Sequence, residues 1–129
     1  MIRKLGSRFA AGENSAAASG FAVAIAAVDS HGNTVLLTKM NGAPPFAVHM
    51  ATQKAYTAIA MNTTTSDLTP LVQPGAELFG LTEASGGKLL PFGGGAVLSL
   101  QEGERYGIGV SGGTTEQDVA ILEQVIAEQ

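Results

Sequence analysis

The alternation of apolar side chains predicts a central β-strand over residues 21–28. The large side chains are those of Phe21, Val23 and Ile25, and the small ones between them are Ala22, Ala24 and Ala26. A strand that is apolar on both faces is covered on both faces. Because the alanine face has little bulk, we expect another element to approach the sheet closely on that side.

Turn-forming residues join the strands into two hairpins. Residues 29–33 (Asp-Ser-His-Gly-Asn) reverse the chain into a second strand over residues 34–40. A second hairpin connects residues 96–101 to residues 104–111 through a tight turn. All of these strands are therefore expected to pair with antiparallel neighbours.

The middle helix has a face made of alanines. Pro44 and Pro45 open this helix, which is expected over residues 46–61. Its alanine stripe consists of Ala47, Ala51, Ala55 and Ala58. In the last strand, Gly107 and Gly109 leave one face equally bare. Both surfaces are typical of a helix that lies very close to a sheet.

Two further helices are expected near the ends of the chain. Residues 1–19 predict a short, imperfect helix, because Gly6 and Gly12 each weaken it by about 1 kcal/mol. The last helix begins after residue 113, and its expected buried stripe is Val119, Leu122, Val125 and Ile126. Two capping pairs are possible at its start, Thr114 with Gln117 or Thr115 with Asp118.

The order of elements indicates the fold class. Between residues 62 and 91 Pro and Gly interrupt short apolar pieces, and an excursion of this length is often functional. The order helix, hairpin, helix, excursion, hairpin, helix predicts an α+β fold with an antiparallel sheet packed by helices. A parallel doubly wound sheet is disfavoured, because neither hairpin has room for a crossover.

Composition narrows the functional classes. The 129 residues suit one domain, and 14% are charged, against a usual share of about 25%. A net charge of −4 with seven Lys and Arg cannot neutralise a row of phosphates, so nucleic acid is a poor partner. Without Cys there is no disulfide and no thiolate metal site. So little charge favours self-association into a homo-oligomer.

The start of the chain superficially resembles a signal peptide. Basic residues Arg3, Lys4 and Arg8 precede the apolar residues 21–28. That apolar run is too short to span a membrane and ends in a turn at Asp29. We therefore expect a soluble, cytoplasmic protein with no membrane partner.

Four separated blocks of residues resemble those of one known family. They are residues 28–33 (VDSHGN), 39–44 (KMNGAP), 54–58 (KAYTA) and 107–118 (GIGVSGGTTEQD). In this order they are similar to the haem-degrading, GlcG/HbpS-like domain, which is also the C-terminal domain of PduO-type proteins. The resemblance covers about residues 20–128.

The resemblance implies a profilin-like fold, with a five-stranded antiparallel sheet and helices packed on both sides, in homo-oligomers. Some members bind haem or help to degrade it, so haem is the cofactor that the family implies. Two features depart from the family. Asn41 stands where the family usually has Asp, and the N-terminal helix is shorter and richer in Gly. Because no His precedes His31, that helix offers no imidazole to haem.

Two glycine-rich loops are candidate ligand-binding sites. They consist of Gly93, Gly94 and Gly95, and of Ser111, Gly112 and Gly113. The backbone amides of such loops, helped by a helix N-terminus, hold anions such as a small-molecule carboxylate. Ordinary turn geometry is the alternative, since Glu116 and Asp118 would repel an anion there. Neither loop matches a nucleotide-binding fingerprint.

Lys54 is the candidate catalytic residue. It is the only cation in the middle helix and matches the Lys of the family's Lys-Ala block. A lone Lys among Ala and Met side chains can serve as a desolvated base or an anion partner. The alternative is a surface Lys whose stem lies along apolar side chains.

His49 is the candidate metal ligand. It shares a helix face with Gln53 but not fully with Lys54. As an axial ligand its imidazole would hold haem iron, and the alternative is a His without a ligand. His31 is a weaker candidate, because its hairpin turn explains it. Two His and no Cys argue against a protein-only zinc site.

Three functions stay open at this point. The first is a small-ligand-binding, oligomeric domain that binds or handles haem. The second is an isomerase, lyase or hydratase acting on a small carboxylated metabolite, with Lys54 and the glycine loops at its site. The third is an accessory structural subunit without a ligand.

Overall fold

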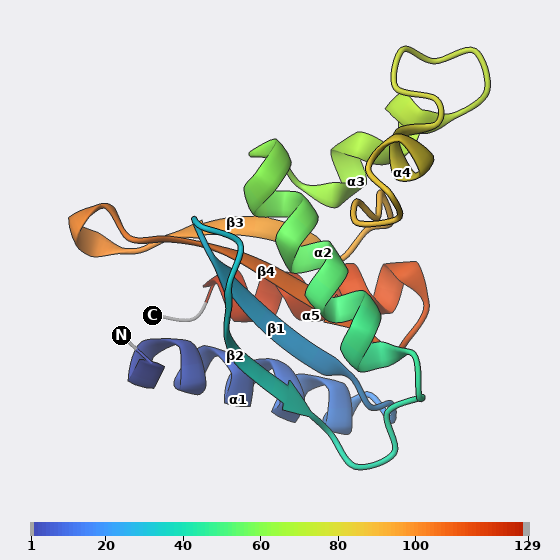
Figure 1. The fold of residues 1–129 in the computed structure, drawn as a ribbon. Helices are drawn as coiled ribbons and strands as arrows, with labels where there is room; N and C mark the ends of the chain where they lie inside the picture. Colours follow the sequence, from blue (N-terminus) through green and yellow to red (C-terminus); the bar gives the residue numbers. More distant parts are fainter. Residues whose placement is uncertain (1, 128–129) are drawn as a thin grey trace.

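The chain folds into an antiparallel sheet with helices on both faces (Figure 1). The computed structural model describes residues 2–127, so Met1 of the expected first helix and residues 128–129 lie outside the described residues. The strands are β1 (Ala24–Asp29), β2 (Thr34–Lys39), β3 (Gly95–Ser99) and β4 (Arg105–Ser111). Their order is β2-β1-β4-β3, and each neighbouring pair is antiparallel. The pairs β1–β2 and β3–β4 are the two predicted hairpins, and β1 with β4 joins them into one sheet.

Three longer helices cover the sheet. They are α1 (Ile2–Ala18), α2 (Ala47–Met61) and α5 (Thr115–Ala127). Helices α1 and α5 lie together on one face of the sheet, and α2 lies on the other (Figure 1). The α+β class with helices on both sides of an antiparallel sheet is thereby confirmed. Among the described residues, no helix combines the length and apolarity needed to cross a membrane.

Within residues 2–127 the sheet has four strands, so the expectation of a five-stranded sheet is wrong. The segment between α2 and β3 forms only short helical turns, α3 (Thr65–Leu68), η1 (Thr69–Val72) and α4 (Leu81–Ala84). This segment has no alternating apolar run, and its prolines lack the amide that a sheet ladder needs. Strand β3 therefore stays at the edge of the sheet.

Helix α1 lies within the expected residues 1–19, and it is continuous in spite of its glycines. It spans 17 residues and buries Leu5 and Phe9. Gly12 faces α5, where an added Cβ would lie 2.6 Å from Val125 Cγ2. Tertiary packing thus outweighs the weak propensity, since the missing side chain at Gly12 lets α1 lie close to α5.

Helix α2 lies directly on the backbone of β4, as the two bare surfaces predict. An added Cβ at Gly107 would lie 2.0 Å from the Ala55 carbonyl oxygen. At Gly109 it would lie 2.0 Å from the Ala51 carbonyl oxygen. The alanine stripe and the glycines of β4 are therefore confirmed as a packing surface.

The large apolar side chains gather on the opposite face of the sheet. Those of α1, the strands and α5 include Phe9, Ile25, Ile108, Val110, Ile121 and Val125. In α5 the buried residues are Asp118, Ile121, Leu122 and Val125. The expected stripe is therefore wrong at Val119 and Ile126, which are half-buried, and it omits Asp118 and Ile121.

Candidate functional site

The start of α5 decides between the two possible capping pairs. The Thr114 amide donates to Gln117 Oε1 at 2.9 Å, and the Gln117 amide donates to Thr114 Oγ1 at 3.2 Å. This reciprocal pair caps the helix. Asp118 is left for another role, and its side chain turns inward to Lys54.

Lys54 and Asp118 form a buried ion pair. Lys54 Nζ lies 3.0 Å from Asp118 Oδ2 and also donates to the Val110 carbonyl oxygen at 2.9 Å. Only 2% of Lys54 and 3% of Asp118 are exposed. Gly94 makes room for this contact, because an added Cβ there would lie 3.1 Å from Lys54 Nζ.

The ion pair balances opposing electrostatic effects. Burial lowers the pKa of Lys54, and the nearby Asp118 carboxylate opposes this shift. Burial raises the pKa of Asp118, and Lys54 opposes that shift in turn. The Gly113 amide also donates to Asp118 Oδ1 at 2.9 Å. Both charged groups therefore have direct partners within the protein.

The two glycine loops lie around this ion pair. Gly93, Gly94 and Gly95 are buried, and the Gly95 amide donates to Thr65 Oγ1 at 2.8 Å. In the second loop, Ser111 is buried, and the Gly113 amide donates to the Asp118 carboxylate. The anion beside this loop is thus the chain's own Asp118. That the loops bind a ligand, and that Lys54 is catalytic, stay predictions.

Asp118 is the partner that sequence reasoning missed. It shares one helix face with Ile121, Leu122 and Val125, at the spacing of a buried stripe. Lys54 lies in the same way among the alanines of α2. Two opposite charges, each within a buried stripe, were the signal that could have predicted the pair.

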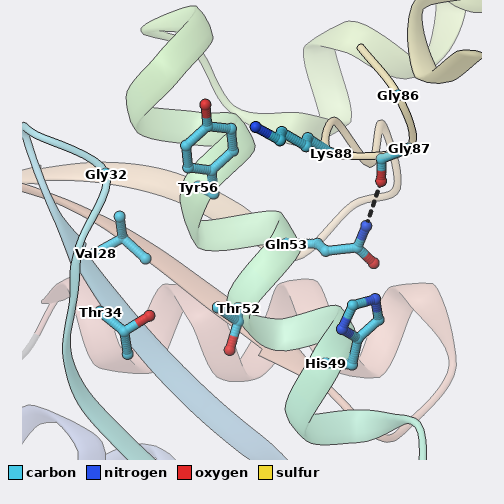
Figure 2. A pocket seen from close by; sticks show the side chains of 10 residues that line it. All are labelled: Val28, Gly32, Thr34, His49, Thr52, Gln53, Tyr56, Gly86, Gly87 and Lys88. Carbon is cyan, nitrogen blue, oxygen red and sulfur yellow. Dashed lines mark hydrogen bonds between the residues drawn. The ribbon is translucent and has the colours of Figure 1, made fainter.

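His49 lies on a different side of α2, at an open pocket (Figure 2). The pocket has a volume of about 510 Å³, within the range of small-molecule sites. Its walls come from α2, from the β1–β2 hairpin and from the segment after α4 (Figure 2). The lining residues are Val28, Gly32, Thr34, His49, Thr52, Gln53, Tyr56, Gly86, Gly87 and Lys88. His49 and Lys54 are therefore not brought together.

The hairpin turn between β1 and β2 forms one wall of the pocket. Asp29 Oδ1 accepts hydrogen bonds from the His31 and Asn33 amides, each at 2.9 Å. The hydrogen bond from the Asn33 amide has the largest effect on the pKa of Asp29 and holds it below its ordinary value. Gly32 packs against Tyr56, whose Cε1 would lie 3.3 Å from an added Cβ. The hydrogen bonds within the turn thus account for its residues without a ligand. The His31 side chain is exposed and does not line the pocket.

The comparisons with known proteins assign the family. Residues 6–127 match the family described as haem-degrading protein HbpS-like. The chain belongs to the HbpS-like family. Among the side chains that the structure describes, no three His, Asp or Glu of this HbpS-like chain are grouped to hold a metal ion.

Solved structures of other HbpS-like proteins share the fold. The crystal structure of a PduOC:heme complex superposes with a TM-score of 0.93 at 36% identity, over 98% of this chain and 92% of that chain. A double mutant of HbpS from Streptomyces reticuli superposes with a TM-score of 0.84 at 26% identity. That match covers 98% of this chain and 84% of the other.

Two relatives from Citrobacter freundii match in sequence. The corrinoid adenosyltransferase PduO is 43% identical over 105 residues, which are 81% of this chain and 31% of PduO. An uncharacterized 15.0 kDa protein of the dhaT-dhaS intergenic region is 38% identical over 104 residues, 81% of this chain and 73% of that protein. This HbpS-like chain therefore spans less than a third of the length of PduO.

Proposed function

We propose that this HbpS-like chain binds haem in the pocket beside α2, with His49 as an axial ligand of the iron. The observation that carries the proposal is the exposed His49 side chain at the wall of a pocket of about 510 Å³. Imidazole is a common ligand of haem iron. The PduOC:heme complex, a structure with 36% sequence identity, supports the choice of ligand.

The chemistry of the pocket fits an iron porphyrin. One imidazole is sufficient, because a porphyrin brings its own nitrogen donors to the iron. The Tyr56 ring and the Val28 side chain line the same pocket and offer apolar surface to the macrocycle. The bound group would supply redox-active iron, while the chain supplies ligation and orientation.

We also propose that copies of the chain associate. Leu71, Phe79 and Phe92 are 38%, 65% and 49% exposed. They belong to the segment between α2 and β3, part of which projects from the layers of the fold (Figure 1). Phe79 and Phe92 line the same surface pocket, and exposed apolar side chains that gather in this way are typical of protein contacts.

Native mass spectrometry of the protein incubated with hemin tests both parts. We expect an assembly larger than the monomer that carries the added mass of haem. A monomer with retained haem would contradict only the association. An assembly that retains no haem would contradict haem binding.

A further inference from the structure

The pocket beside α2 has an unusual balance of charge for this chain. The sequence has 11 Asp and Glu but seven Lys and Arg. Among the described residues, those that line the pocket include Lys88 and His49 but none of the acidic ones. An acidic protein thus has a pocket whose only permanent charge, within the described lining, is positive. Such a lining favours an anionic group on the ligand.

The end of α4 brings Lys88 to the pocket. Gly86 and Gly87 have φ angles of 68° and 84°, which favour glycine. The Gly87 amide donates to the Thr82 carbonyl at 2.8 Å, and the Gly86 amide donates to the Glu83 carbonyl at 3.0 Å. These two hydrogen bonds form the pattern that commonly ends a helix and turns the chain. Lys88 follows directly after this turn.

Two side chains of α2 hold the backbone on either side of Lys88. Gln53 Nε2 donates to the Gly87 carbonyl oxygen at 2.7 Å (Figure 2). The Leu90 amide donates to Thr57 Oγ1 at 2.8 Å. Gln53 and Thr57 lie one helical turn apart, so α2 itself fixes the position of Lys88.

The Lys88 side chain is directed at the pocket. In Figure 2 its ammonium group extends in the direction of Tyr56, which also lines the pocket. Lys88 is exposed and has no hydrogen bond or ion pair with another described residue. A cation held at a pocket wall without an internal partner is suited to an anionic ligand group.

We propose that Lys88 binds a carboxylate of the ligand and that Gln53 is the residue that positions it. This inference rests on the proposed function, because it specifies which porphyrins the pocket selects. The pocket favours porphyrins with free carboxylates over porphyrins whose carboxylates are esterified. Iron ligation by His49 and carboxylate binding by Lys88 are separate contributions to affinity.

The test compares hemin with hemin dimethyl ester by titration of the wild type and of Lys88→Met. We expect Lys88→Met to weaken hemin binding about fivefold, as for an ion pair at a partly solvated site, and to leave diester binding unchanged. Lys88→Arg keeps the charge and should keep most of the preference for hemin. Lys4→Met, which removes an exposed charge from α1 across the sheet, is the matched control.

Gln53→Ala tests the positioning role. We expect the ratio of hemin to diester affinity to fall, because Lys88 is no longer held in place. Gln53 also lines the pocket, and any effect of its loss that is common to both ligands cancels in this ratio. A purely structural defect would weaken both ligands equally. The ratio of the two affinities can also be measured with metal-free protoporphyrin and its dimethyl ester, by porphyrin fluorescence. Because these porphyrins have no iron, that ratio does not depend on ligation by His49.

The possible outcomes separate the two proposals. If hemin and its diester both bind, but Lys88→Met weakens both equally or neither, the inference is overturned and haem binding stands. If neither porphyrin binds the wild type, the proposed function fails and the inference fails with it. If metal-free protoporphyrin binds with the expected preference while hemin binding does not need His49, the Lys88 inference stands without iron ligation.

Discussion

Lys54 Nζ lies 3.0 Å from Asp118 Oδ2 and joins two helices that cover opposite faces of the sheet (Figure 1). Removing one buried partner leaves the other charge unpaired, at a cost of about 3–5 kcal/mol. We expect Lys54→Met to lower the free energy of unfolding by an amount of this order, measured by urea denaturation. The control Lys4→Met should change it by less than about 0.5 kcal/mol.

Lys54→Met combined with Asp118→Asn removes both charges and keeps an acceptor for the Gly113 amide. We expect this double variant to recover most of the lost stability. A single variant Lys54→Met as stable as the wild type would contradict a structural role for the pair. It would favour the catalytic role predicted for Lys54.

The same ion pair predicts how stability depends on pH. The raised pKa of Asp118 means that its contribution to stability falls as pH rises above 3.8 and through the folded-state value. The lowered pKa of Lys54 means that its contribution recovers as pH rises from the folded-state value toward 10.5. The charged pair therefore contributes least to stability at pH values between these two ranges.

Urea unfolding of the wild type and of the double variant at acid, neutral and alkaline pH checks this dependence. We expect the stability of the double variant, relative to the wild type, to be greatest near neutral pH. The difference should shrink toward both ends of the range. A stability difference between the two proteins that is smallest near neutral pH would contradict the raised pKa of Asp118 and the lowered pKa of Lys54.

Substitution by Ala is predicted to have opposite effects at a glycine in the contact of α2 with β4 and at a glycine of α1 that faces open space. Gly109→Ala places a Cβ 2.0 Å from the Ala51 carbonyl oxygen, so the helix must move away from the sheet. We expect a loss of more than about 4 kcal/mol or a failure to fold. Gly6→Ala meets nothing within 4 Å and should gain about 1 kcal/mol from helix propensity. Thermal melting of both variants decides whether the close approach explains the glycines.

Thr57 links α2 to the segment that follows α4. Its Oγ1 donates to the Gln53 carbonyl at 2.6 Å and accepts from the Leu90 amide at 2.8 Å. Thr57→Val keeps the shape but leaves the Leu90 amide without this partner, at a cost of about 1–3 kcal/mol. We expect faster hydrogen exchange at Leu90, with the amides of β1 unchanged. Equal exchange at Leu90 in both proteins would show that Thr57 does not hold the segment.

The sequence alone allowed the sheet and its close contact with α2 to be predicted. Gly107 and Gly109 alternate with large side chains, and this local pattern has one simple explanation. The fifth strand was wrong because it came from resemblance alone, whereas Pro70 and Pro74 lie in a segment without a strand pattern. The alternation of small and large side chains along a strand can be recognised from the sequence, because it involves only residues that are neighbours in the chain.

The site was harder to predict, because it depends on residues far apart in the chain. Lys54 and Asp118 meet only when α2 and α5 are both packed on the sheet. Lys88 attracted no attention in the sequence, because its position depends on two hydrogen bonds of the neighbouring backbone: Gln53 donates to the Gly87 carbonyl oxygen, and Thr57 accepts from the Leu90 amide. Spacing along the chain does not encode such contacts.

Hemin titration of the wild type, His49→Ala and His31→Ala, followed by the Soret absorption, tests haem binding at the pocket most directly. The chain has two His, so His31→Ala is the matched control outside the pocket lining. We expect a saturable Soret shift for the wild type and for His31→Ala, and its loss or displacement for His49→Ala. A shift that His49→Ala leaves unchanged, or no saturable shift for the wild type, would contradict the proposed haem site.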